Sequence, residues 1–159
     1  MPVTVLSAVR RAGVRAANLR VAARALLKVL GETAGELTVV LVDDEEIRDL
    51  NREYRGQDRP TDVLAFAMRE GRRTAGDECL LGDIVISLDT AARQARRRGR
   101  TLEREIRTLF IHGLLHLLGY DHERSPAEAR RMRAKERELE KILPHSQPRP
   151  VPPRSHSRR

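Results

Sequence analysis

Residues 37–54 read LTVVLVDDEEIRDLNREY, a strand signal that runs directly into a helix signal. Leu37–Val42 is rich in β-branched residues, as is typical of a buried strand. In the acidic residues that follow, Asp43 is placed to cap a helix and Glu46 to complete the capping box, so we expect a helix to about Tyr54. A buried strand followed at once by a helix predicts a domain in which helices pack against a sheet.

The same signals recur on both sides of this stretch. Gly99 and Gly119 are placed to end helices, whereas Ser125 and Pro126 mark a helix start. We predict further strands at Val63–Ala67 and Ile84–Ile86, and helices at Arg10–Leu30, Ser87–Arg98, Thr101–Leu118 and Ser125–Leu143. The predicted fold class is α+β, a single domain with a small sheet of about four strands flanked by about five helices.

Length and composition limit the class of protein. The chain has 159 residues, 40% of them hydrophobic, which suits one domain with its own core. A single cysteine, Cys79, excludes an internal disulfide framework and a cysteine-based zinc finger, and we expect no disulfide-linked partner. No apolar run approaches the roughly 20 residues that cross a bilayer, and no secretory signal is recognisable, so we expect a cytoplasmic protein without a membrane partner.

The positive charge is unevenly distributed. The net charge is +8, and the segment 144–159 supplies half of it because it holds four arginines and no acid. Five of the eight prolines also lie there, so we expect a domain over residues 1–143 and a disordered, basic Pro/Arg-rich tail over 144–159. Two roles for this tail stay open, either nucleic-acid binding by counterion release or a dispensable solubilising extension.

The chemistry is concentrated in residues 110–123, FIHGLLHLLGYDHE. His112 and His116 are four apart on a predicted helix and so share one face. Gly119 ends that helix, and the chain then turns so that His122 can approach the other two. Three imidazoles around one ion, with the fourth position open, is the arrangement of a catalytic zinc site. The same ligands suit nickel, copper or iron, so the predicted cofactor is one Zn²⁺ with other transition metals as alternatives.

A histidine on an apolar helix is more often a satisfied core residue than a metal ligand. Two histidines at this spacing, with a third just past a helix-ending glycine, make metal binding the better interpretation, because unpartnered imidazoles in an apolar environment are costly. Asp121 is either a carboxylate that accepts an N–H from an imidazole or only a turn residue.

The spacing H-x-x-x-H-x-x-G-x-x-H also occurs in metzincin peptidases, which place a glutamate general base directly after the first histidine. Here that position is Gly113, so the group that would take the proton from water is missing. The sequence therefore predicts a hydrolysis other than proteolysis.

Further polar candidates lie in Asn51–Phe66, NREYRGQDRPTDVLAF. Arg55 and Arg59 are both able to hold a phosphate through two hydrogen bonds. Asp62 and Asp83, which each precede a predicted strand, are candidates for substrate binding or for supporting a metal ligand. Asp83 is alternatively only a residue at the start of a strand.

Three segments carry a resemblance to a known family. Residues 112–122, HGLLHLLGYDH, together with Asn51–Phe66 and Leu81–Ser87, resemble the YbeY family of bacterial single-strand-specific metallo-endoribonucleases. The resemblance covers roughly residues 37–143 and departs where the family often has Ser-Phe-Pro and this chain has Ala65-Phe66-Ala67. It implies a small mixed sheet flanked by helices.

The resemblance also implies roles for individual residues. His112, His116 and His122 would bind zinc, and Arg55 would be the arginine on which activity depends, so that Arg55 and His116 are the catalytic candidates. The implied function is zinc-dependent cleavage of single-stranded RNA in maturation of the 16S rRNA 3′ end and in ribosome quality control, with rRNA and the small ribosomal subunit as partners. Two alternatives stay open, a non-catalytic RNA-binding or ribosome assembly module with a structural metal, and a metalloprotease-like hydrolase.

Overall fold

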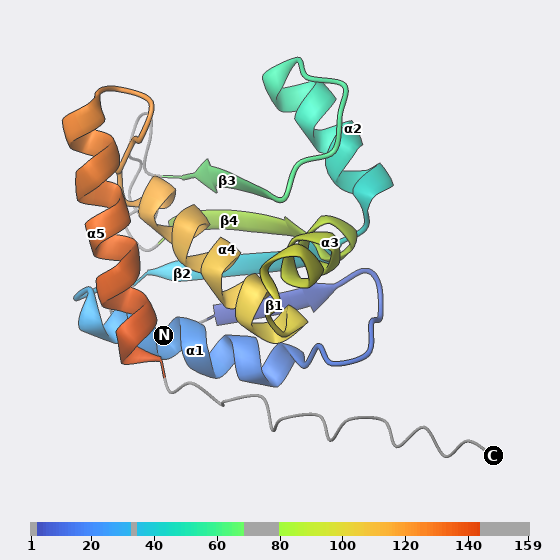
Figure 1. The fold of residues 1–159 in the computed structure, drawn as a ribbon, viewed down its shortest axis with the longest axis horizontal. Helices are drawn as coiled ribbons and strands as arrows, with labels where there is room; N and C mark the ends of the chain where they lie inside the picture. The colour runs from blue at the N-terminus through green and yellow to red at the C-terminus, as the bar shows by residue number, and fades with distance from the viewer. Residues whose placement is uncertain (1–2, 33–34, 69–79, 144–159) are drawn as a thin grey trace.

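Four strands form one mixed sheet in the order β1-β2-β4-β3 (Figure 1). A computed structural model describes residues 3–32, 35–68 and 80–143. The elements are β1 (Val3–Ser7), α1 (Ala16–Val29), β2 (Glu36–Val42), α2 (Asp44–Arg55), β3 (Val63–Ala67), β4 (Leu80–Ser87), α3 (Leu88–Arg98), α4 (Leu102–Leu117) and α5 (Pro126–Ile142). β1, β2 and β4 are parallel, whereas β3 is an antiparallel edge strand beside β4. The predicted α+β class, with a four-stranded sheet and five helices, is confirmed.

Most helix boundaries follow the capping signals in the sequence. The side chains of Asp43, Ser87, Thr101 and Ser125 each accept a hydrogen bond from the backbone N–H three residues later, and each precedes a helix. This contact satisfies one of the donors that a helix leaves unpaired at its start. The four predicted helix starts are therefore confirmed.

The N-terminal prediction was wrong in two respects. The predicted helix from Arg10 begins only at Ala16, because the chain first turns at Gly13, whose φ is +84°. Before that turn, Val3–Ser7 forms β1, a strand that was not predicted. β1 is a short edge strand that buries only Val3 and Val5, and it therefore lacks the long apolar run by which β2 was recognised.

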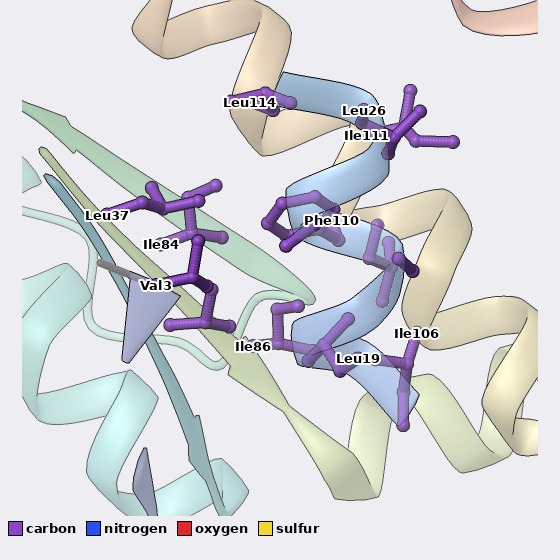
Figure 2. Packing of buried hydrophobic residues seen from close by; sticks show 14 of the residues in the cluster. Val3, Leu19, Leu26, Leu37, Ile84, Ile86, Ile106, Phe110, Ile111 and Leu114 are labelled. Carbon is purple, nitrogen blue, oxygen red and sulfur yellow. The ribbon is translucent and has the colours of Figure 1, made fainter. Parts of the chain in front are cut away.

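The sheet separates two apolar clusters. On one face, α1 and α4 pack against β1, β2 and β4, and Phe110 of α4 lies at the centre of this larger cluster with Leu26 of α1 (Figure 2). On the other face, Ile47 of α2 packs with Leu64 and Val85. Strand alternation assigns each strand residue to one of these faces, and this assignment decides which polar residues reach the site.

The predicted tail over 144–159 lies outside the described residues and stays a prediction, and Cys79 lies outside them as well. Among the helices that are described, none combines the length and the apolar character needed to cross a bilayer.

Candidate metal centre

The three histidines come from the C-terminal half of α4 and the turn that follows it. His112 and His116 lie on the same face of α4, as their spacing predicts. Gly119, with φ of +96°, ends the helix, and its N–H donates to the carbonyl of His116 at 3.1 Å. A glycine is needed here because other residues rarely adopt positive φ. The chain then turns back and brings His122 beside the first two histidines.

The distances fit a small cation. The Nε2 atoms of His112 and His116 lie 3.1 Å apart, and one ring nitrogen from each of the three histidines lies within 4.8 Å of the others. Ligand nitrogens on a tetrahedral zinc ion, each about 2.0–2.1 Å from the metal, are separated by about 3.3 Å. The three residues are therefore close enough to bind a metal ion with little rearrangement, as predicted.

One carboxylate supports this cluster from another helix. His112 Nδ1 lies 2.9 Å from Oε1 of Glu136 on α5. A carboxylate accepts hydrogen bonds, so this contact favours a proton on Nδ1 of His112 and directs Nε2 toward the other histidines. Glu136 cannot be recognised from the sequence, because its contact with His112 depends on how α5 packs against α4.

The surroundings of His116 favour the neutral form of its ring. Burial lowers the pKa of His116 below its ordinary value of 6.5, and the positive charges that His112, His122 and Arg55 can carry lower it further, against an opposing effect of Asp121. Neutral imidazole is the form that binds a metal ion. The environment of His116 therefore favours metal binding near neutral pH.

Gly113 is buried between the two helical histidines. A Cβ at this position would lie 3.0 Å from Ile84 Cγ2 and 3.2 Å from Val63 Cγ2, closer than ordinary contacts. A glutamate at this position, as in metzincin peptidases, would require the side chains of Ile84 and Val63 to shift. The structure thus gives a packing reason for the glycine, in addition to the chemical argument against proteolysis.

A cleft of 430 Å³ opens at the histidines, and Arg55, Asp62 and Asp121 also line it. These side chains come from the end of α2, the start of β3 and the turn after α4. A second cleft of 480 Å³ between α1 and α4 has mainly apolar walls and shares none of these residues. The histidine cleft is the one that combines a possible metal-binding cluster with an arginine and carboxylates, a combination typical of catalytic sites.

Arg55 is the last residue of α2, one residue beyond the predicted end of this helix, and its side chain is exposed. Among the described residues, no carboxylate forms an ion pair with Arg55. The loop after it is fixed by the buried side chain of Asn51, whose Nδ2 donates to the carbonyl of Arg59 at 2.9 Å. The guanidinium is therefore available to an anion that enters the cleft.

The two aspartates in the cleft wall also stabilise local structure. Asp62 accepts from the backbone N–H of Val63 at 2.8 Å and from Nε2 of Gln94 at 3.1 Å, which ties the start of β3 to α3. Asp121 accepts from the backbone N–H of Glu123 at 2.9 Å. Of the two interpretations of Asp121, the turn residue is the one with a hydrogen bond in the structure.

Two of the predicted candidates lie outside the cleft wall. Arg59 donates from Nε and Nη2 to Oε1 of Gln57, at 3.1 and 2.9 Å. Asp83 pairs with Phe66 across β3 and β4 and is on the sheet face of Val85, which α2 covers, whereas the histidines are on the opposite face. Strand alternation thus points Asp83 away from the histidines, and of its two interpretations the strand-start residue is the one that agrees with this position.

A histidine cluster in a cleft beside a mixed sheet is the arrangement of a metal-dependent hydrolase, and comparisons with known proteins agree. The sequence model of the family described as Endoribonuclease YbeY matches residues 9–143. An Endoribonuclease YbeY of Geobacter metallireducens is 48% identical over 90% of this chain and 96% of its own length. One from an Anaeromyxobacter species is 55% identical over 78% of this chain, which spans 62% of that relative.

A solved structure agrees as well. The solution structure of TM1509 from Thermotoga maritima is similar with a TM-score of 0.59 and 30% identity, over 88% of this chain and 87% of the other. The chain therefore belongs to the endoribonuclease YbeY family.

Proposed function

We propose that this protein is a zinc-dependent endoribonuclease that cleaves single-stranded RNA. The observation that supports it best is the set of three histidine nitrogens within 4.8 Å of one another, in the cleft that Arg55 also lines. The names of its relatives support the endonuclease activity, because those proteins are described as endoribonucleases.

The proposed metal ligands are His112, His116 and His122. A zinc ion held there would act as a Lewis acid toward a phosphate oxygen and would lower the pKa of water toward neutrality. Three protein ligands leave a position for substrate, as in catalytic rather than structural zinc sites. Among the described residues, the group able to hold a metal consists of these three histidines, without a fourth protein ligand.

Arg55 is the proposed catalytic partner of this site. Its guanidinium presents parallel N–H donors that match two phosphate oxygens. Negative charge on these oxygens increases as the phosphodiester is cleaved, so donors placed in advance stabilise the transition state more than the ground state. The cleft residues thereby bind and orient the scissile phosphate.

We further propose the biological setting implied by the family resemblance. The protein would act on 16S rRNA during maturation of its 3′ end and in ribosome quality control, with the small ribosomal subunit as partner, in the cytoplasm. The net charge of +8 supports a polyanionic partner.

The proposal is tested with His116→Ala, which removes one ligand from the centre of the cluster. We expect this variant to lose both bound zinc and cleavage of a single-stranded fragment of the rRNA 3′ end. Wild-type protein incubated with casein in parallel should leave the casein intact. Full nuclease activity in a verified zinc-free His116→Ala protein would overturn the proposal, and RNA binding without cleavage by the wild type would favour the assembly module.

A further inference from the structure

Two glutamates on one face of α5 contact α4 in matching register. Oε1 of Glu136 lies 2.9 Å from Nδ1 of His112, and Oε1 of Glu140 accepts a hydrogen bond from Thr108 Oγ1 at 2.6 Å. On each helix the two residues are four apart, and their order shows that α4 and α5 run antiparallel. The contacts are therefore equivalent in position but not in chemistry, because only Glu136 reaches a histidine.

The Glu136 contact is partly protected from water. The side chains of His112 and Glu136 are 32% and 26% exposed, respectively. A carboxylate that accepts from an imidazole N–H fixes the tautomer and the orientation of the ring, and it makes the other nitrogen a better donor to a metal. His112 thus presents Nε2, the atom that lies 3.1 Å from Nε2 of His116.

Helix α5 also contacts the turn on the other side of the cluster. It begins at Pro126, four residues after His122, and the guanidinium of Arg131 lies over the ring of Tyr120, 5.7 Å from the ring centroid. The helix that carries Glu136 therefore also contacts the segment between α4 and His122.

We propose that Glu136 is a positioning residue that sets the metal affinity of the site by holding His112 as the Nδ1–H tautomer. This inference rests on the metal site proposed above, and it adds a residue of α5 to the three histidines. Glu136 contacts neither the metal nor the substrate and acts only through the His112 ring.

The experiment measures the zinc affinity of the wild type, Glu136→Ala and Glu140→Ala by competition with a chromophoric chelator. Glu140→Ala is the matched control, because it also removes a carboxylate between α5 and α4. We expect zinc to bind about 10–100-fold more weakly to Glu136→Ala and within about twofold of wild type to Glu140→Ala. Glu136→Gln keeps an acceptor oxygen without the charge, so its affinity should lie between wild type and Glu136→Ala, and this isosteric variant serves if the alanine variant does not fold.

A second readout does not depend on zinc. In the zinc-free wild type, ¹⁵N NMR shifts should show His112 as the Nδ1–H tautomer, and in Glu136→Ala they should show both tautomers. Zinc affinity in Glu136→Ala equal to that of wild type, or an equal loss in Glu140→Ala, would overturn the role of Glu136. A wild-type protein that binds no zinc would instead overturn the metal site itself, and this proposal with it.

Discussion

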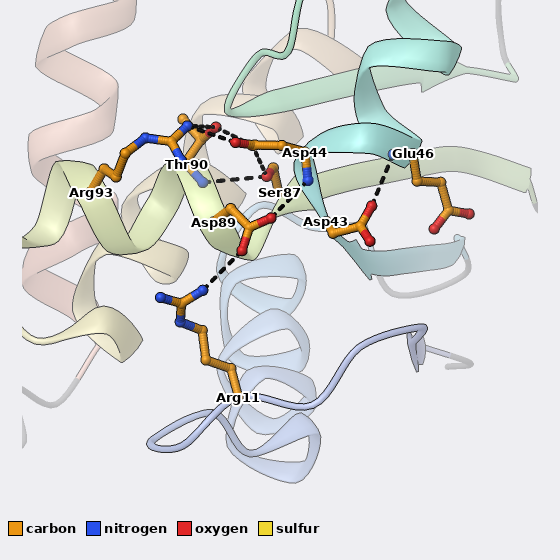
Figure 3. Close-up of polar contacts among 8 residues, drawn as sticks. All are labelled: Arg11, Asp43, Asp44, Glu46, Ser87, Asp89, Thr90 and Arg93. Carbon is orange, nitrogen blue, oxygen red and sulfur yellow. Dashed lines mark hydrogen bonds and ion pairs between the residues drawn. The ribbon is translucent and has the colours of Figure 1, made fainter.

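Two polar clusters border the sheet, and they differ in whether their polar groups form hydrogen bonds and ion pairs with one another. The first is the Asp44 cluster, consisting of Asp44, Ser87, Thr90 and Arg93, at the ends of β2 and β4 (Figure 3). The second is the histidine cleft on the α4 side of the sheet. The first cluster contains Ser87, which caps α3, and the second contains three histidines close enough to bind a metal ion.

The polar groups of the Asp44 cluster bond to one another, and in this sense the cluster is closed. The carboxylate of Asp44 accepts from the hydroxyls of Ser87 and Thr90, both at 2.6 Å, and from Nη2 of Arg93 at 2.8 Å. Burial raises the pKa of Asp44, but these three hydrogen bonds and the charge of Arg93 outweigh it, so the pKa lies below the ordinary value of 3.8. The hydroxyls of Ser87 and Thr90 and Nη2 of Arg93 thus share one acceptor group, and the cluster joins α2 to α3.

The histidine cleft is not balanced in this way. His112 contacts Glu136, and Nε2 of His122 lies 4.0 Å from Oε1 of Glu123, but the guanidinium of Arg55 forms no ion pair within the described part of the chain. We infer from this comparison that the Asp44 cluster stabilises the fold, whereas the histidine cleft has polar groups left to bind a ligand.

The largest effect that would test this contrast is expected for Arg55→Ala. Zinc should stay bound, while cleavage falls about 10²–10³-fold, because one donor to the developing charge is lost. The matched control is Arg59→Ala, since Arg59 is four residues away and contacts Gln57 rather than the cleft, and its activity should stay within about twofold. Cleavage kinetics with zinc content measured on the same samples check both, and unchanged turnover in Arg55→Ala would remove Arg55 from the mechanism.

A substitution in the Asp44 cluster should lower the stability of the protein and leave its function unchanged. Asp44→Ala leaves the fully buried hydroxyl of Ser87 without its acceptor, so we expect a loss of about 3 kcal/mol in the free energy of unfolding. Asp49→Ala, which removes an exposed carboxylate from the same helix, should cost less than about 1 kcal/mol. Chemical denaturation gives the values, and loss of zinc from folded Asp44→Ala would show that the clusters are not independent.

The packing of α4 against the sheet should affect both stability and zinc affinity. Gly113→Ala adds a Cβ 3.0 Å from Ile84, and overpacking of this kind should reduce stability by about 2 kcal/mol. Because α4 carries His112 and His116, zinc affinity should fall with it. The control is Gly35→Ala, whose Cβ would make an ordinary 3.4 Å contact with Leu81. Equal stabilities of the two variants would contradict the tight packing inferred at Gly113.

The smallest expected effect is a pH dependence of the Asp44 cluster. The pKa of Asp44 is lower in the folded state than its ordinary 3.8, so the folded protein binds fewer protons there than the unfolded chain. Its stabilisation is therefore fully present above about pH 4 and is lost as the pH falls through the lowered pKa. The difference in unfolding free energy between wild type and Asp44→Ala should narrow on acidification from about pH 5 to pH 3. A difference that widens instead would contradict the lowered pKa of Asp44.

Much of the fold was predictable from local signals. Capping residues such as Ser87 and Ser125 contact a backbone N–H only three residues away, so sequence alone reveals them. The histidine cluster was predictable for the same reason, since a helix repeat and one glycine bring three nearby residues together.

The contacts that were missed or misplaced depend on distant parts of the chain. Glu136 is one of four glutamates on α5, and only the packing of α5 on α4 distinguishes it from the others. The pairing of β4 with β3 and β2 determines the face of the sheet on which Asp83 lies. β1 is stabilised by its parallel pairing with β2, more than thirty residues further along the chain, and its own short sequence carries little signal.

The most direct test of the central claim is a titration of metal-depleted protein with zinc, with cleavage of a single-stranded rRNA 3′ fragment measured at each step. Depletion should abolish cleavage, and activity should return in proportion to added zinc and level off at one ion per chain, as one set of three histidines predicts. Full cleavage by verified metal-free protein, or activity that stays absent when one equivalent of zinc is bound, would contradict a catalytic zinc site at His112, His116 and His122.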